Sequence, residues 1–97
     1  MSTYIALFKW TARGIMSVKE SPARAQASLK AVEAAGAKVI GFWYTDGIYD
    51  MVAVAEWADE EAVTAFLMAQ ASQGFVRITT LKARTAAEFA EIVKLVP

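Results

Sequence analysis

The segment from Trp43 to Trp57, with the sequence WYTDGIYDMVAVAEW, constrains the fold of this chain more than any other. Its aromatic residues stop at Thr45, Asp46 and Gly47, which are typical turn residues, and an almost continuous apolar run follows. Alternate side chains of a strand point to opposite faces, so an apolar run of this kind is buried on both. The segment therefore predicts a hairpin at the centre of a sheet.

Periodicity and capping residues divide the rest of the chain into alternating strands and helices. Short runs that are apolar on both faces predict strands, and apolar residues at helical spacing before a glycine predict helices. Residues 12–20 are expected to form a loop. The expected strands are 3–11, 38–44, 49–57 and 75–84, and the expected helices are 21–36, 59–74 and one that starts at Thr85.

The first helix is expected to face the sheet with a narrow apolar stripe. Ala25, Leu29 and Val32 recur at helical spacing, whereas Arg24 is expected elsewhere on the surface. Ser21 is expected to cap the start of this helix. A regular amphipathic helix of this kind covers one face of a sheet.

The end of the chain carries a capping box, in which Thr85 is followed three residues later by Glu88. The strand before it, FVRITTLKAR, is more polar than the others and is expected at an edge of the sheet. The last helix is expected to bury its apolar residues, which are Phe89, Ile92, Val93 and Val96.

The order of the elements predicts one α+β domain over residues 1–97. Strand, helix, strand, strand, helix, strand is the ferredoxin-like βαββαβ arrangement, an antiparallel four-stranded sheet with both helices on one face, followed by a C-terminal helix. The strands are apolar on both sides, so the face without helices needs a cover. A second protomer stacked sheet to sheet, as in a dimeric α/β barrel, would supply it.

Composition supports an oligomer. A chain of 97 residues buries only about 60 to 65 % of its unfolded surface. Its hydrophobic fraction is 57 %, above the roughly 45 to 50 % of an ordinary soluble domain. One small core cannot hide that much apolar surface, and we expect a homodimer or a higher homo-oligomer.

Charge and residue usage exclude several classes of function. The chain has ten basic and ten acidic residues, so no net field favours nucleic acid or an anionic membrane. No apolar run is long enough to span a membrane, and we expect a cytoplasmic protein. The absence of cysteine and histidine removes thiolate and imidazole chemistry, including haem ligation. We expect no metal and no cofactor.

Candidate site residues gather around the turn of the hairpin. Asp50 is the first candidate, because an acid at the start of a buried strand must be paired, hydrogen-bonded or protonated. It could bind a ligand or move a proton, or it could accept turn amides or pair with a cation. The residues expected to contact a ligand are Asp50, Tyr49, Lys9, Arg77 and Tyr44. Each of them also has a structural interpretation, as an ion-pair partner or an interface residue.

The sequence resembles the GYD domain family over nearly its whole length. The likeness lies in FKWTARGI, KESPARAQA, GAKVIGFWYTDGIYDMVAV and GFVRITTL, and the family's glycine, tyrosine and aspartate correspond to Gly47, Tyr49 and Asp50. Residues 56–60 lack a proline that the family pattern would place there. The resemblance implies a ferredoxin-like, dimeric α/β-barrel protein, and it implies no particular activity.

Three functions are compatible with these observations. The first is a small oligomer that binds a small, partly apolar molecule in a barrel or interface pocket near the turn. The second is a cofactor-free enzyme of the monooxygenase or isomerase type, in which Asp50 or a tyrosine moves a proton; this rests on analogy of fold. The third is a purely structural or interaction protein. The sequence is thus compatible both with an enzyme and with a protein that only binds or interacts.

Overall fold

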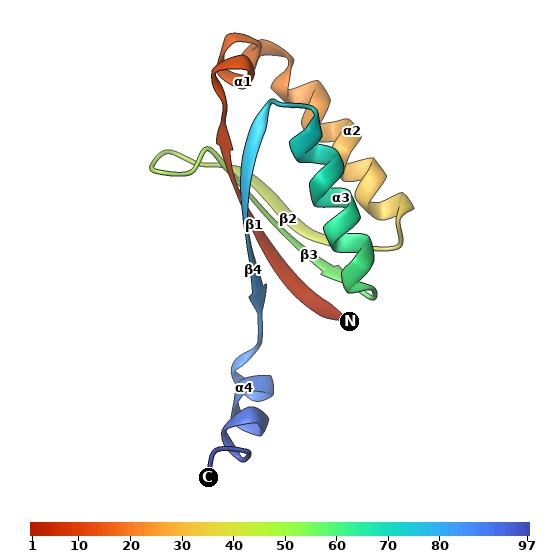
Figure 1. Ribbon diagram of the computed structural model, residues 1–97, viewed down its shortest axis with the longest axis vertical. Coiled ribbons are helices and arrows are strands. Elements are labelled where there is room, and N and C mark those ends of the chain that lie inside the picture. Colours follow the sequence, from red (N-terminus) through yellow and green to blue (C-terminus); the bar gives the residue numbers. More distant parts are fainter.

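The computed structural model describes residues 1–97 and confirms an α+β fold (Figure 1). None of its helices combines the length and the apolar character that a bilayer crossing requires. The elements in chain order are β1 (Ser2–Trp10), α1 (Ala12–Met16), the 3-10 helix η1 (Val18–Glu20), α2 (Ser21–Ala34), β2 (Lys38–Tyr44), β3 (Met51–Trp57), α3 (Glu60–Ser72), β4 (Val76–Ala83) and α4 (Ala86–Val93).

The four strands form one antiparallel sheet in the order β2-β3-β1-β4, which is consistent with a ferredoxin-like fold. The polar strand β4 lies at an edge, as predicted. The prediction of a central hairpin is only half right, because β3 is an inner strand whereas β2 forms the other edge. The β2–β3 turn is also longer than predicted, since β3 begins at Met51 rather than at Tyr49.

Helices α2 and α3 cover one face of the sheet, which we call the covered face (Figure 1). Val32 of α2 and Val63 of α3 pack with Trp57 and Ala37 in a small core. Only seven of the 97 residues are buried. A large share of the apolar surface therefore stays outside the core of a single chain.

The opposite face of the sheet, which we call the bare face, carries no helix. Cross-strand partners share a face, and Ile5 is paired with Val54 on one side and Leu81 on the other. Leu7 is paired with Val52 on one side and with Thr79 on the other. The predicted two-sided apolar character is therefore confirmed for the middle of the inner strands, whereas Lys9 and its register partner Arg77 lie at one end of the bare face.

A β-bulge in β2 corrects the predicted faces of that strand. The register shifts between Val39 and Gly41, so Val39 packs against the core, whereas strict alternation along the predicted strand 38–44 would place Val39 on the same face as Trp43. A Cβ at position 41 would collide with the Trp43 ring. The glycine thus lets the indole lie flat across the bare face.

The loop predicted for residues 12–20 is wrong, because the chain forms α1 and η1 there. Thr11 caps α1 by accepting a hydrogen bond from the Gly14 amide, and its hydroxyl donates to the Gly74 carbonyl at 2.6 Å. A Cβ on Gly14 would collide with the Phe75 carbonyl. These contacts fasten α1 to the connection between α3 and β4. A five-residue helix is too short to show a period in the sequence.

The last helix has the predicted capping box but not the predicted burial. Both hydrogen bonds of the box between Thr85 and Glu88 are present. However, α4 lies beyond the end of β4, away from the sheet and the other helices (Figure 1). We call residues 84–97 the C-terminal arm. Its apolar residues, predicted to be buried, are exposed at Phe89 (58 %), Ile92 (36 %), Val93 (50 %) and Val96 (69 %).

Candidate ligand pocket

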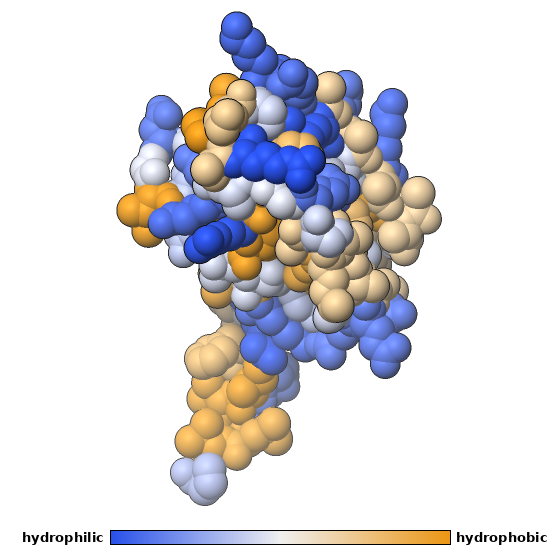
Figure 2. Space-filling model, turned by 45° about the horizontal axis from the view of Figure 1, so that its top comes forward, coloured by the Kyte–Doolittle hydropathy of each residue, from blue (hydrophilic) through white to orange (hydrophobic).

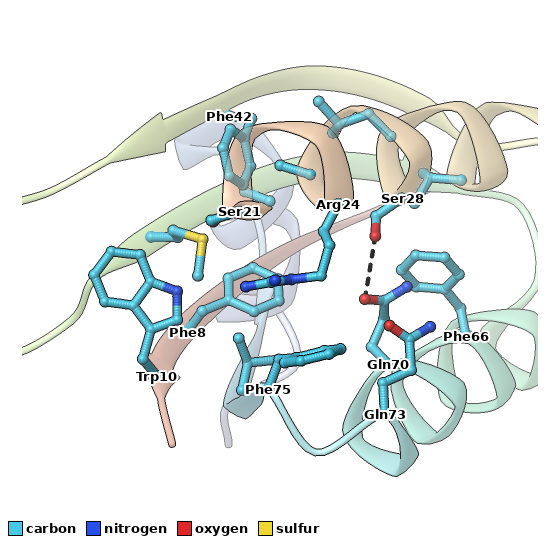
Figure 3. Close-up of a pocket in the computed structure, with 16 residues that line it drawn as sticks. Phe8, Trp10, Ser21, Arg24, Ser28, Phe42, Phe66, Gln70, Gln73 and Phe75 are labelled. Carbon is cyan, nitrogen blue, oxygen red and sulfur yellow. Dashed lines mark hydrogen bonds between the residues drawn. The ribbon is translucent and has the colours of Figure 1, made fainter. Parts of the chain in front are cut away.

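A pocket of about 90 Å³ lies between the covered face and helices α2 and α3 (Figure 3). Most of its wall is apolar, with aromatic rings from β1, β2, α3 and the residue that precedes β4. The polar residues that line it contain no aspartate and no glutamate; they are Ser21, Arg24, Ser28, Gln70 and Gln73. The aromatic lining residues are Phe8, Trp10, Phe42, Phe66 and Phe75.

Trp10 ends β1 and turns its indole into this pocket. Its Nε1 atom is buried and has no hydrogen-bond partner in the chain. The ring lies 6.4 Å from that of Tyr44, centroid to centroid. Leaving a buried donor without an acceptor costs about 1 to 3 kcal/mol, so such groups are uncommon in folded proteins. An acceptor on a bound molecule would remove this cost.

Arg24 reaches from α2 into the pocket toward Phe75 (Figure 3). Its guanidinium carbon lies 4.1 Å from the centroid of the Phe75 ring, and its Nη1 donates to the Ser17 carbonyl at 3.1 Å. The ion pairs of the chain are Lys82–Glu60 and Lys94–Glu91, and Arg24 takes part in neither. The pocket therefore holds a positive charge that no carboxylate of the chain neutralises.

Two hydroxyl groups extend the polar part of the pocket. Ser21, predicted to cap α2, lies inside the helix, and Glu20 takes the cap position without a side-chain hydrogen bond. The Ser21 hydroxyl is buried and lies 3.1 Å from that of Tyr44. On the other side, Ser28 donates to Gln70 at 3.2 Å and so connects α2 to α3 (Figure 3).

Three of the residues predicted to contact a ligand gather elsewhere. Lys9 and Arg77 are register partners on β1 and β4, and they lie on the bare face with Leu7 and Ile5 at alternate positions. The Lys9 ammonium is 5.8 Å from the centroid of the Tyr49 ring. None of these three lines the pocket. The structure therefore divides the predicted set, with Tyr44 beside the pocket and Lys9, Tyr49 and Arg77 at one end of the bare face.

Asp50 ties the turn to the end of β1. Its Oδ2 accepts a hydrogen bond from the Trp10 amide at 2.9 Å, and its own amide donates to the Phe8 carbonyl at 2.8 Å. Its carbonyl accepts from the Thr45 amide. Asp50 forms no ion pair with a cation of the chain. Of the interpretations open to it, that of an acceptor for turn amides comes nearest, although the amide that donates to the carboxylate belongs to the end of β1 and not to the turn.

A family model, the GYD domain, matches residues 4–93. The chain belongs to the GYD domain family. The crystal structure of TTHA0845 from Thermus thermophilus is similar to this GYD domain with a TM-score of 0.56 and 24 % sequence identity, over 89 % of this chain and 96 % of that one. At this identity the likeness shows the fold alone. The comparison with curated proteins gives no match.

The glycine and the aspartate of the GYD domain have structural explanations in this chain. Gly47 adopts a φ of 145°, which residues with a side chain rarely adopt. The Asp50 carbonyl closes the turn by accepting from the Thr45 amide, and its carboxylate attaches the turn to β1 by accepting from the Trp10 amide. The turn therefore holds the end of β1 in place, and through it the indole of Trp10 at the pocket.

Sequence reasoning missed the residue that gives the pocket its charge. Arg24 was expected elsewhere on the surface, yet it lines the pocket of the GYD domain. A signal was present, because the lining residues of α2 follow one helical face at spacings of three and four. Those residues are Ser21, Arg24, Ala25, Ser28, Leu29 and Val32.

The titratable groups with shifted pKa values lie outside the pocket. The pKa of the Glu60 carboxyl is lowered first by the Lys82 ammonium, which donates to it at 2.9 Å, and then by the Tyr4 hydroxyl. Desolvation, followed by the hydrogen bond to Glu60, raises the pKa of Tyr4. The backbone hydrogen bond in the capping box lowers the pKa of Glu88. Glu60 and Glu88 lie in the first turns of α3 and α4, and Lys82 lies on the edge strand β4.

Proposed function

We propose that this GYD domain binds a small, mostly apolar molecule that carries a carboxylate, in the pocket beneath α2 and α3. The observation that carries the proposal is the buried Nε1–H of Trp10, which has no acceptor in a pocket that also holds Arg24. A carboxylate oxygen would satisfy the indole donor. The same group would neutralise the guanidinium.

The electrostatics of the pocket favour an anion over a cation. Its lining offers one guanidinium, an indole N–H and hydroxyl groups, and it contains no acidic side chain. Arginine binds carboxylates with two parallel hydrogen bonds, which are shorter and stronger than neutral ones. Stacking on Phe75 restricts the orientation of the Arg24 guanidinium, and so less freedom is lost on binding. A cationic ligand would meet no compensating charge.

The size and the walls of the pocket define the rest of the ligand. A cavity of about 90 Å³ is smaller than the roughly 150 Å³ cavity that accommodates benzene. Aromatic and aliphatic side chains form most of the surface, as in other small-molecule sites. The pocket therefore suits a short-chain carboxylic acid, or the acid end of a larger molecule.

The five residues predicted from the sequence take different parts in this proposal. Tyr44 supports the pocket through its hydroxyl contact with Ser21 and its ring contact with Trp10. Ligand contacts of Lys9, Tyr49 and Arg77 stay a prediction for the bare face. Asp50 does not line the pocket, and one of its oxygens already accepts a backbone amide. We therefore propose that the domain binds a ligand in the pocket, and we do not propose that Asp50 transfers a proton.

Calorimetric titration of the intact protein with small carboxylic acids, and with their amides as controls, tests the proposal. We expect the acids to bind and the matched amides to bind at least about tenfold more weakly, because charge-assisted hydrogen bonds contribute about 1.5 to 3 kcal/mol. Arg24→Gln should weaken acid binding by the same factor. Arg13→Gln is the control, because Arg13 also stacks on Phe75 but does not line the pocket. Equal affinity in wild type and Arg24→Gln would refute the proposal.

We also propose that a second copy of the chain covers the bare face. Support comes from the apolar residues Ile5, Leu7, Val52, Val54 and Leu81 that share this face, and from the small number of buried residues. Sheets stacked face to face lie about 10 Å apart and interdigitate such side chains. Light scattering should show a dimer or a multiple of it, and Val54→Asp should dissociate it. A stable monomer at micromolar concentration would contradict this.

A further inference from the structure

We infer that the C-terminal arm packs against a second copy of the chain. The inference rests on the dimer proposed above. It goes further because it makes α4 part of the contact between the two copies. A dimer formed only through the bare faces would leave the arm exposed. The arm extends beyond the sheet of its own protomer (Figure 1).

The first line of evidence is the apolar stripe of the arm. Four of its apolar residues follow the helical spacing of three, four and seven, and Leu95 beside them is 81 % exposed. Figure 2 shows hydrophobic side chains gathered on the projection at the bottom of the molecule. Exposed apolar patches of several hundred Å² mark interaction sites. The residues of the stripe are Phe89, Ile92, Val93 and Val96.

The second line of evidence is the length of α4. It has eight residues and makes no extensive contact with another element of the chain. Isolated helices shorter than about 12 to 15 residues are marginal in water. A capping box contributes only about 1 kcal/mol, which does not compensate for the missing packing. The helix therefore needs a surface to pack against.

The direction and the area of the arm favour a second copy over the chain's own body. The arm continues from β4 away from the sheet (Figure 1). With about 100 Å² for each partly exposed apolar side chain, the stripe and Leu95 come to on the order of 500 Å² per arm. Two arms in a two-fold dimer approach the roughly 1,200 Å² of a small specific interface, and the bare face supplies the remainder.

The polar side of the arm does not suit a membrane surface. Helices that lie on anionic membranes carry lysine and arginine on their polar face. Here the polar positions include Glu88 and Glu91, and Lys94 is paired with Glu91 at 3.0 Å. The charge pattern therefore favours a protein surface.

Hydrogen–deuterium exchange of the intact protein at several concentrations tests the inference. We expect the α4 amides to exchange at least about tenfold more slowly in the oligomer than in diluted monomer, because only docking protects so short a helix. A dimer whose α4 amides exchange freely would overturn the role of the arm and leave the bare-face dimer standing. Protection that persists in a monomer would show that the arm folds onto its own chain, which also overturns the inference.

A pair of substitutions on opposite sides of α4 completes the test. Phe89→Asp places a charge in the stripe, and Ala87→Asp places the same charge about half a turn away from it. In sedimentation velocity, we expect Phe89→Asp to raise the dimer Kd at least about tenfold, and Ala87→Asp to change it less than about twofold. Equal effects would overturn the inference. A wild-type chain that is monomeric throughout would instead refute the dimer itself.

Discussion

Helices α2 and α3 pack on the sheet and α4 does not, although the sequence of α4 is the most typical of a helix with one buried face. The apolar and polar side chains of α4 are separated far more sharply than those of α2 or α3. Nevertheless, α2 and α3 pack on the sheet, and α4 makes no extensive contact with another element of the chain. The weakly amphipathic helices direct polar groups inward, such as Arg24, Ser28 and Gln70.

The difference separates two kinds of surface in one small protein. Polar groups on the inside of α2 and α3 interrupt the packing and form a pocket with a charge. Apolar groups on α4 form a surface that no other element of the chain covers. Polar groups on a buried face and a contiguous apolar patch on an exposed face both depart from the usual pattern, and these two departures support the ligand and the partner proposed above.

Two identical substitutions, one in each kind of helix, give the strongest contrast. Val63 on α3 is 5 % exposed, and Val93 on α4 is 50 % exposed. We expect Val63→Ala to lower the free energy of unfolding by about 2 kcal/mol, because it leaves a cavity in the core. In dilute monomer, Val93→Ala should change it by less than about 0.5 kcal/mol. Denaturant titration measures both, and equal losses would place Val93 in a packed core.

The link between the turn and the pocket can be broken at Asp50. Asp50→Ala removes the acceptor of the part-buried Trp10 amide, and we expect it to cost about 1 to 2 kcal/mol of unfolding free energy. Asp50→Asn keeps an acceptor oxygen and should cost less. Asp46→Ala, in the exposed part of the same turn, serves as the control in these thermal unfolding experiments. A loss at Asp46 as large as that at Asp50 would disprove the role of the Trp10 contact.

The indole donor of the pocket can be removed without removing the aromatic ring. Trp10→Phe deletes the Nε1–H, and we expect carboxylate affinity to fall about two- to tenfold, the range of one neutral hydrogen bond. Trp43→Phe makes the same change on the bare face and should leave the affinity unaltered. Calorimetric titration compares the two variants. An unchanged affinity in Trp10→Phe would mean that the ligand does not accept from the indole.

The smallest expected effect is a pH dependence at the edge of the covered face. The folded pKa of Glu60 is lower than its ordinary value of 4.5, chiefly because Lys82 donates to it. The stabilisation is therefore fully present above that ordinary value and is lost as the pH falls through the lower folded pKa. We expect a modest decrease in Tm over this acidic window, and Glu60→Gln should make that decrease smaller. An identical pH profile in the variant would contradict the assignment.

Sequence patterns predicted the strands, the main helices and the two-sided apolar sheet because these depend on local periodicity. They misplaced Val39, because a single bulge residue in β2 reverses the alternation. They also missed the charge of the pocket. Arg24 has the spacing of the helical stripe, but arginine is usually excluded from a buried face. In the structure, the pocket beside the Phe75 ring accommodates its guanidinium.

The sequence by itself determined the capping box of α4 and the stripe of apolar residues along it, since both depend on neighbours within a few positions. It also determined that one small core could not hold the apolar residues of this chain. Only the tertiary structure decided which of them stay exposed. The reason is geometric, because α4 follows an edge strand and extends beyond the sheet, so its stripe does not contact the core of its own chain.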